Sequence, residues 1–93
     1  MRFRFTVGLG AAIALCLIAS PGAARADACS DLWFGRNQIY KAAGYCFRTS
    51  RAIAAFGNAG CQYDALEDVP LSARDRAAVA RYVREEAALG CGP

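Results

Sequence analysis

The sequence predicts a small all-α protein, a three-helix domain stapled by two disulfides that follows a cleaved signal peptide. Three observations lead to this fold class. A short apolar segment near the N-terminus ends in small residues, a pattern typical of exported proteins. Three stretches downstream contain residues that commonly start and end helices, and each stretch ends at or next to a glycine. Four cysteines follow the leader, an even number that favours disulfides in an exported chain.

The first 26 residues are predicted to be a secretory signal peptide. They begin MRFR, continue with the apolar run FTVGLGAAIALCLIA and end in the small-residue segment SPGAARA. Ala24 and Ala26 form an A-x-A site, which places cleavage after Ala26. The alternative is an uncleaved membrane anchor, but the apolar run is shorter than the roughly 20 residues that span a bilayer. Lipidation of Cys16 is disfavoured because Leu15 stands where a small residue is needed.

We therefore expect a signal peptide at 1–26 and one helical domain at 27–93. The chain has eleven Lys and Arg residues, of which Arg2, Arg4 and Arg25 lie in the leader, so the domain carries eight basic side chains against eight acidic ones. A neutral domain does not favour nucleic-acid binding, which needs a net basic surface. We expect a monomer that is exported to the periplasm or the exterior and is not stably inserted in the membrane.

The first helix is expected over residues 31–43. Ser30 is its predicted N-cap, and Gly44 can adopt the left-handed conformation that ends a helix. Trp33 and Tyr40 form an aromatic stripe, so the helix is expected to lie centrally. Gly35 costs about 1 kcal/mol of helix stability relative to alanine. Such a cost suggests a compensating close approach, which we expect from another backbone.

The second helix is expected to be short, with Thr49 as N-cap and SRAIAAF as its body, and to end at Gly57. Ile53 and Phe56 are its candidates for burial. Residues 62–71 show neither helical nor strand periodicity and are expected to form a surface loop.

The third helix is expected to begin after Ser72 and to run to about Leu89, with Gly90 as its cap. Ser72 with Asp75 three positions later resembles a capping box. Arg81 and Glu85 are spaced for an ion pair. The residues expected to face inward are Ala73, Val79, Ala80, Val83 and Ala87, and those expected to face outward are Arg74, Arg81, Arg84 and Glu85.

Four cysteines allow three disulfide connectivities. Cys46 and Cys61 bracket the short helix, and Cys29 and Cys91 bracket the whole domain, which favours these two pairs. No C-x-x-C motif and no histidine are present, so a zinc site is not expected and no cofactor is predicted. A domain of this size needs such covalent support, because it buries only about 60% of its unfolded surface.

The stretch LWFGRNQIYKAAGYCF resembles the signature of the YARHG domain, a bacterial extracellular module. The downstream segments FGNAGCQYD and PLSARDR resemble cysteine-containing members of that family. The resemblance implies a small exported domain that occurs alone or beside peptidase and kinase domains, without an established activity. The motif itself is degenerate here, because Lys41, Ala42 and Ala43 stand where the family has Ala, Arg and His. Any family role of that arginine or histidine is not carried over. The matching positions are Leu32, Trp33, Arg36, Asn37, Ile39, Tyr40, Gly44, Tyr45 and Phe47.

The candidate binding residues are Arg36, Asn37, Tyr40 and Tyr45. An arginine beside an aromatic stripe can recognise an anionic ligand. The alternative is structural: Arg36 would pack along Trp33 or Tyr40, and Asn37 would donate to a loop carbonyl. The aromatic residues could likewise stack on a sugar or form the core, and the core is favoured. They are Trp33, Tyr40, Tyr45, Phe47 and Tyr63.

Catalysis has little support in the sequence, and we do not expect an enzyme. There is no histidine to act as a general base, and oxidised cysteines are not nucleophiles. Asp64, Glu67 and Asp68 lie together, but a solvated acidic loop explains them. The expected function is a cell-envelope interaction module that binds a protein or cell-wall glycan. The alternative is a secreted inhibitor or modulator of an envelope hydrolase.

Overall fold

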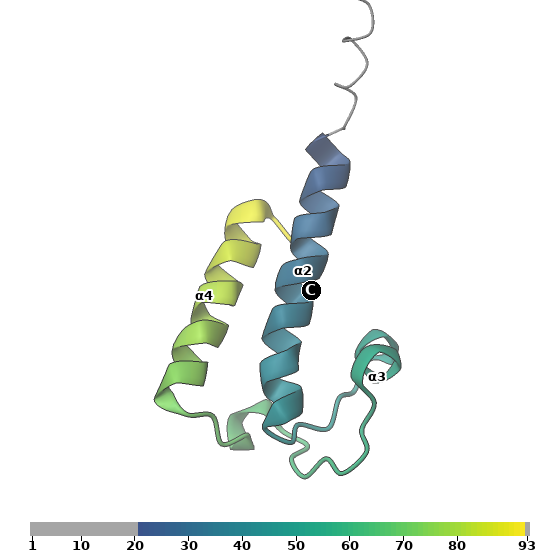
Figure 1. Ribbon diagram of the computed structural model, residues 1–93, viewed down its shortest axis with the longest axis vertical. Helices are drawn as coiled ribbons and strands as arrows, with labels where there is room; N and C mark the ends of the chain where they lie inside the picture. The colour runs from purple at the N-terminus through teal and green to yellow at the C-terminus, as the bar shows by residue number, and fades with distance from the viewer. Residues whose placement is uncertain (1–20, 93) are drawn as a thin grey trace, which may run out of the picture.

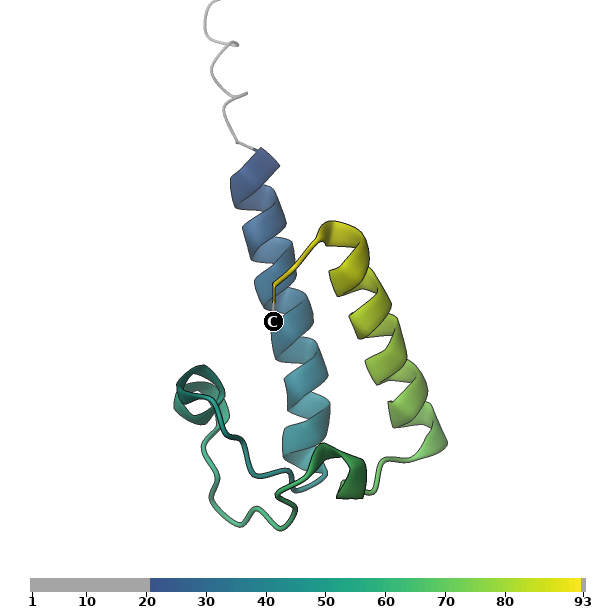
Figure 2. The same cartoon turned by 180° about the vertical axis from the view of Figure 1, so that it is seen from behind.

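The computed structural model describes residues 21–92 and confirms the all-α class. In that range the chain forms α2 (Pro21–Ala42), α3 (Ser50–Phe56), the single 3-10 turn η3 (Leu66–Asp68) and α4 (Ala73–Leu89). Helix α2 lies between the other two α-helices, and α4 returns antiparallel along its side (Figures 1 and 2). The loops that contain η3 close one end of this arrangement. The long helix α2 therefore organises the domain.

Helix α2 begins earlier than predicted. It starts at Pro21, so Ser30 lies inside the helix and the predicted N-cap there is wrong. The reason is local: after a proline, which is well tolerated in the first helical turn, the alanine-rich segment contains nothing that stops a helix. The predicted cleavage site after Ala26 lies within α2. The apolar run of the predicted leader falls in residues 1–20, outside the described range.

We expect the exported protein to begin at Asp27. Residues 22–27 are exposed, so removal of the first turns of α2 would break few packing contacts. Cys29 would remain in the exported chain. The new N-terminus would also place Asp27 near the positive end of the helix dipole. Intact-mass measurement on protein purified from cells that express the full chain tests this. A mass that still includes residues 1–26 would rule the cleavage out.

The caps of α3 and α4 are confirmed. The Thr49 side chain accepts a hydrogen bond from the Ala52 amide, and the Ser72 hydroxyl accepts one from the Asp75 amide at 3.0 Å. Gly90 ends α4 in the left-handed conformation, with a φ of 71°. Each cap satisfies backbone groups that a helix end would otherwise leave unpaired. The loop over residues 62–71 is also present and contains the turn η3.

The face that α4 presents to α2 differs from the prediction. Ala73, Ala80, Val83 and Ala87 are exposed, and only Val79 of the predicted inward set is half-buried. Tyr82 and Glu86 face the domain instead. On α3, Ile53 is exposed, Phe56 is half-buried, and the small Ala52 is the buried residue. The reason is that Tyr82 and Glu86 each have a matching partner on α2, Gly35 and Arg36 respectively.

Gly35 is the partner of Tyr82. A Cβ atom built on Gly35 would lie 2.6 Å from the Tyr82 hydroxyl oxygen, so only glycine leaves room for this ring. The predicted close approach is confirmed, but the approaching group is a side chain and not a backbone. The free energy that glycine costs the helix is thus offset by packing between α2 and α4.

The end of α2 is joined to the following loops by a short backbone ladder. The Gly44 carbonyl accepts hydrogen bonds from the amides of Gln62 and Tyr63, at 2.7 and 3.0 Å, and the Cys46 amide donates to the Tyr63 carbonyl at 2.8 Å. These bonds form an isolated parallel bridge between Tyr45 and Tyr63. The bridge lies beside the Cys46–Cys61 disulfide, so the loop that carries α3 is closed twice at its base.

We expect Gly44→Ala to destabilise the domain by about 1–2 kcal/mol, because a left-handed backbone is costly for an L side chain. Gly44 has a φ of 96°, and an added Cβ would lie 3.3 Å from the Tyr63 ring. Gly92→Ala is the control, since Gly92 does not have positive φ and a Cβ there meets nothing within 4 Å. Urea denaturation followed by circular dichroism measures both variants. Equal urea midpoints for the two variants would show that the backbone conformation at residue 44 does not require glycine.

Candidate functional site

A hollow of about 290 Å³ lined by four aromatic residues lies between α2, the segment before α3, and η3. All four candidate binding residues line it: Arg36, Asn37, Tyr40 and Tyr45. We call this hollow the aromatic concavity. Its other lining residues are Trp33, Phe47, Arg48, Thr49, Ala52 and Leu66. Residues scattered over the sequence from α2 to η3 thus meet at one place.

The wall of the concavity is a chain of ring contacts. Tyr40 lies 5.9 Å from Tyr45, Tyr45 meets Phe47 edge to face at 5.2 Å, and Phe47 stacks on Phe56 at 5.2 Å between ring centroids. Trp33 contacts Phe56 at 5.9 Å. These separations are those of favourable aromatic pairs. Phe47, only 5% exposed, is the centre of the cluster. Of the five aromatic residues predicted to form the core it alone is buried, and the other four, Trp33, Tyr40, Tyr45 and Tyr63, are half-buried.

Asn58 holds Phe47 in this position. Its Oδ1 accepts a hydrogen bond from the Phe47 amide at 2.7 Å, and its Nδ2 donates to the Phe47 carbonyl at 2.9 Å. The side-chain amide therefore pairs with the backbone as a neighbouring strand would. The sequence did not single out Asn58, because no local pattern distinguishes an asparagine that pairs across a loop.

We expect Asn58→Ala to lower the free energy of unfolding by about 1–3 kcal/mol, because it leaves both backbone groups of buried Phe47 without partners. Gln62→Ala, at an exposed position on the same loop, should change it by less than about 0.5 kcal/mol. Denaturant midpoints measure the difference. A negligible effect of Asn58→Ala would mean that water replaces the amide at no cost.

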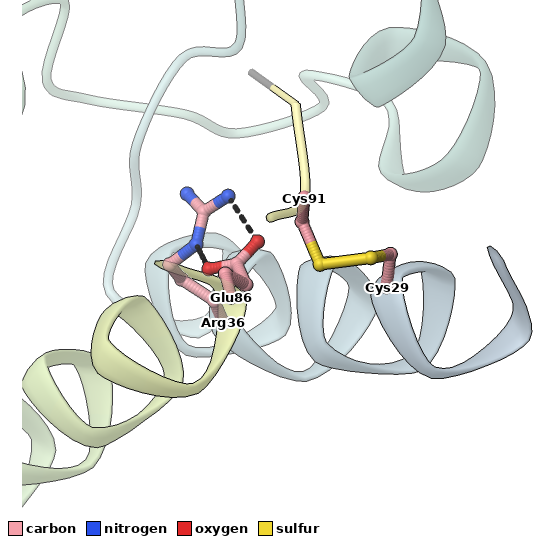
Figure 3. The surroundings of a disulfide bond; sticks show 4 residues. All are labelled: Cys29, Arg36, Glu86 and Cys91. Atoms are coloured by element: carbon pink, nitrogen blue, oxygen red, sulfur yellow. Dashed lines mark hydrogen bonds and ion pairs between the residues drawn. A yellow bond between two sulfur atoms is a disulfide. The ribbon is translucent and has the colours of Figure 1, made fainter. Parts of the chain in front are cut away.

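Arg36 forms an ion pair that the sequence did not indicate. Its Nε donates to Glu86 Oε1 at 2.7 Å and its Nη2 donates to Oε2 at 3.0 Å (Figure 3). The two side chains are 24% and 12% exposed, so the pair is largely shielded from water. Such a two-point contact fixes the plane of the guanidinium. It also connects α2 to α4 across 50 residues of sequence.

The structural roles predicted for Arg36 and Asn37 are corrected in detail. Arg36 pairs with Glu86, and the cation that lies over the Trp33 ring, 3.8 Å from its centroid, is Arg51. Asn37 donates to the Trp33 carbonyl in its own helix at 2.9 Å. The donor to a loop carbonyl is Lys41, which reaches Gly57 at 3.2 Å. Lys41 sits one turn further along α2, where the loop comes within reach.

Both predicted disulfides are present. Cys29–Cys91 joins α2 to the segment after α4, with 5.6 Å between the Cα atoms, and lies next to the Arg36–Glu86 pair (Figure 3). Cys46–Cys61 closes the loop that carries α3, with 5.1 Å between the Cα atoms. The predicted pair Arg81–Glu85 also forms, at 3.6 Å on the exposed face of α4.

The acidic residues Asp64, Glu67 and Asp68 lie exposed on the loop around η3. Within residues 21–92, no group of three or more His, Cys, Asp or Glu side chains is arranged to hold a metal ion. Over the same residues, no helix has the length and apolar character needed to cross a membrane. The aromatic concavity presents guanidinium, amide and ring surfaces to a ligand.

The helical fold and the two disulfides define a small domain of the exported type. The chain belongs to the YARHG domain family, whose model matches residues 14–86. This match confirms the resemblance seen in the sequence. Neither a curated protein nor a solved structure matches the chain in the corresponding comparisons.

Proposed function

We propose that this protein is a small exported interaction module of the cell envelope, which binds a protein or cell-wall component through the aromatic concavity. The observation that carries the proposal is the convergence of Arg36, Asn37, Tyr40 and Tyr45 on one hollow. Half-buried aromatic rings with polar atoms at their margin are typical of recognition sites. We place the module in the periplasm or outside the cell, as its disulfides require an oxidising compartment.

Binding is favoured over catalysis by the chemistry of the residues. The whole sequence contains no histidine, and the four cysteines of the domain are oxidised. No carboxylate of the described residues lines the concavity, and Glu86, the partner of the lining residue Arg36, has both oxygens engaged by it. A site that holds rings and donors in place, without a free base or nucleophile, is suited to recognition.

Site-specific photo-crosslinking in intact cells tests the proposal. A photoreactive phenylalanine analogue replaces Leu66, an exposed residue that lines the concavity, or Val83, an equally apolar and exposed residue on α4 that does not line it. We expect adducts with an envelope protein or with peptidoglycan from position 66 and few from position 83, identified by mass spectrometry. Adducts from both positions alike, or from neither, would overturn the proposal. If the partner from position 66 is a hydrolase, assaying it with equimolar protein distinguishes an inhibitor from a binding module.

A further inference from the structure

The concavity contains a buried acceptor without a partner. Asn37 is 8% exposed, and its Nδ2 donates to the Trp33 carbonyl, which fixes the orientation of the side-chain amide because only an N–H can face that oxygen. Its Oδ1 accepts no hydrogen bond from any residue in 21–92. A buried acceptor in this state costs about 1–3 kcal/mol. A ligand that brings an N–H to this atom would recover that free energy.

Two groups at the same hollow supply donors. Arg36 uses Nε and Nη2 for Glu86, and its Nη1 lies on the side away from the carboxylate (Figure 3). That nitrogen bonds to none of the described residues, and the ion pair holds it in a fixed orientation. Arg48 is exposed at the margin and forms no ion pair within the described part of the chain.

The charge balance selects a monoanion. Glu86 neutralises Arg36, so Arg48 is the one charged residue lining the concavity that forms no ion pair with the described residues. Asp64 and Glu67 share the adjoining hollow with Arg48 and further disfavour a doubly charged anion. A phosphate dianion would be poorly matched. A sugar is also poorly matched, because its hydroxyl groups need several acceptors and no carboxylate from the described part of the chain lines the concavity. The remaining wall is apolar and aromatic, with Tyr40, Tyr45 and Leu66, and its volume of about 290 Å³ suits a body the size of one amino-acid residue.

We propose that the aromatic concavity binds the free α-carboxylate end of a peptide. The amide N–H of the terminal residue donates to Asn37 Oδ1, and its carboxylate accepts from Arg36 Nη1 and from Arg48. Its apolar side chain packs against Tyr40 and Tyr45. An amide N–H and a carboxylate attached to the same carbon atom are what distinguish a peptide terminus from other monoanions. This inference rests on the proposed interaction function and specifies its ligand.

Isothermal titration with short acetylated peptides tests the inference, using protein purified from cells that express the full chain. Each peptide is compared as free acid and as terminal amide, and one series ends in L-leucine while another ends in D-alanyl-D-alanine. We expect the free acid to bind at least about tenfold more tightly than its amide, because charged hydrogen bonds are lost. The preferred series identifies the source of the ligand, a protein C-terminus or a cell-wall stem peptide.

Two further comparisons locate the contacts. Arg48→Gln should weaken binding of the acid by about fivefold or more, whereas Arg84→Gln, at an exposed arginine of α4, should leave it unchanged. A peptide with an N-methylated terminal amide, which lacks the N–H for Asn37, should also bind about fivefold more weakly. This second test changes only the ligand, so it does not depend on the folding of a variant.

Equal affinities for acid and amide would overturn the inference, and so would the absence of measurable binding to every peptide at millimolar concentration. Displacement of the peptides by a peptide-free cell-wall disaccharide would overturn it in favour of a glycan site. In each of these cases the crosslinking from position 66 still decides the proposed function independently. If a partner is captured from position 66 but free acids are not bound selectively, the proposed interaction function is supported and only the peptide C-terminus is rejected as its ligand.

Discussion

Reduction of the two disulfides is expected to abolish the cooperative thermal unfolding transition of this domain. The bonds close loops with sequence separations of 62 and 15 residues. In the chain-entropy model these contribute about 4 and about 3 kcal/mol, before native strain is subtracted. A typical small domain is stable by about 5–15 kcal/mol in total. The noncovalent core here is small, with Phe47, Ala52 and Val69 as the buried hydrophobic residues of the described chain.

Circular dichroism during heating, with and without a thiol reductant, measures this effect. Two double variants separate the contributions. Replacing Cys29 and Cys91 by serine should lower the midpoint more than replacing Cys46 and Cys61, because the first bond closes the longer loop and joins α2 to the end of α4. A reduced sample that keeps its cooperative transition would show that helix packing alone suffices.

Glu86→Ala is expected to destabilise the domain by about 3 kcal/mol, the largest effect we expect of a single substitution outside the cysteines. The substitution leaves the Arg36 guanidinium in a shielded position, 24% exposed, without its carboxylate. Removing one partner of such a pair costs more than the pair itself contributes, because the remaining charge keeps its desolvation penalty. Packing between α2 and α4 beside the Cys29–Cys91 disulfide would loosen as a consequence.

The neighbouring residue provides a matched control. Glu85 pairs with Arg81 at 3.6 Å, but these side chains are 51% and 54% exposed. Glu85→Ala should therefore change the free energy of unfolding by less than about 1 kcal/mol. Urea denaturation of the two variants under identical conditions makes the comparison. Similar losses for both would mean that the Arg36–Glu86 pair is solvated and contributes no more than a surface pair.

Much of the fold was predictable because it depends on local sequence. The body of α3, with Thr49 as its cap, and the limits of α4, between Ser72 and Gly90, follow from side chains that bond to their own helix ends. The disulfide pairing was predictable from the positions of the cysteines around the helices. The start of α2 was not, because Ser30 has the chemistry of a cap but the preceding alanine-rich segment is itself helical.

The candidate site was predictable in its residues but not in its contacts. The sequence stretch around Arg36 and Tyr45 identified four residues that share one concavity. It did not indicate Asn58, whose role appears only when the loop folds back on Phe47. It also did not indicate Glu86, which a charged position near the end of an amphipathic helix would ordinarily place in solvent.

By itself, the sequence determined the helical class, the caps of α3 and α4, the two disulfides and membership of the family. Each of these depends on neighbouring residues or on the types and positions of residues in the chain. Only the tertiary structure decided which face of α4 packs against α2 and which polar atoms are left free. The physical reason is that these outcomes arise from pairs far apart in sequence, Gly35 with Tyr82 and Arg36 with Glu86. A glycine leaves the space for a ring, and a carboxylate fixes a guanidinium, only when both members of the pair are brought together.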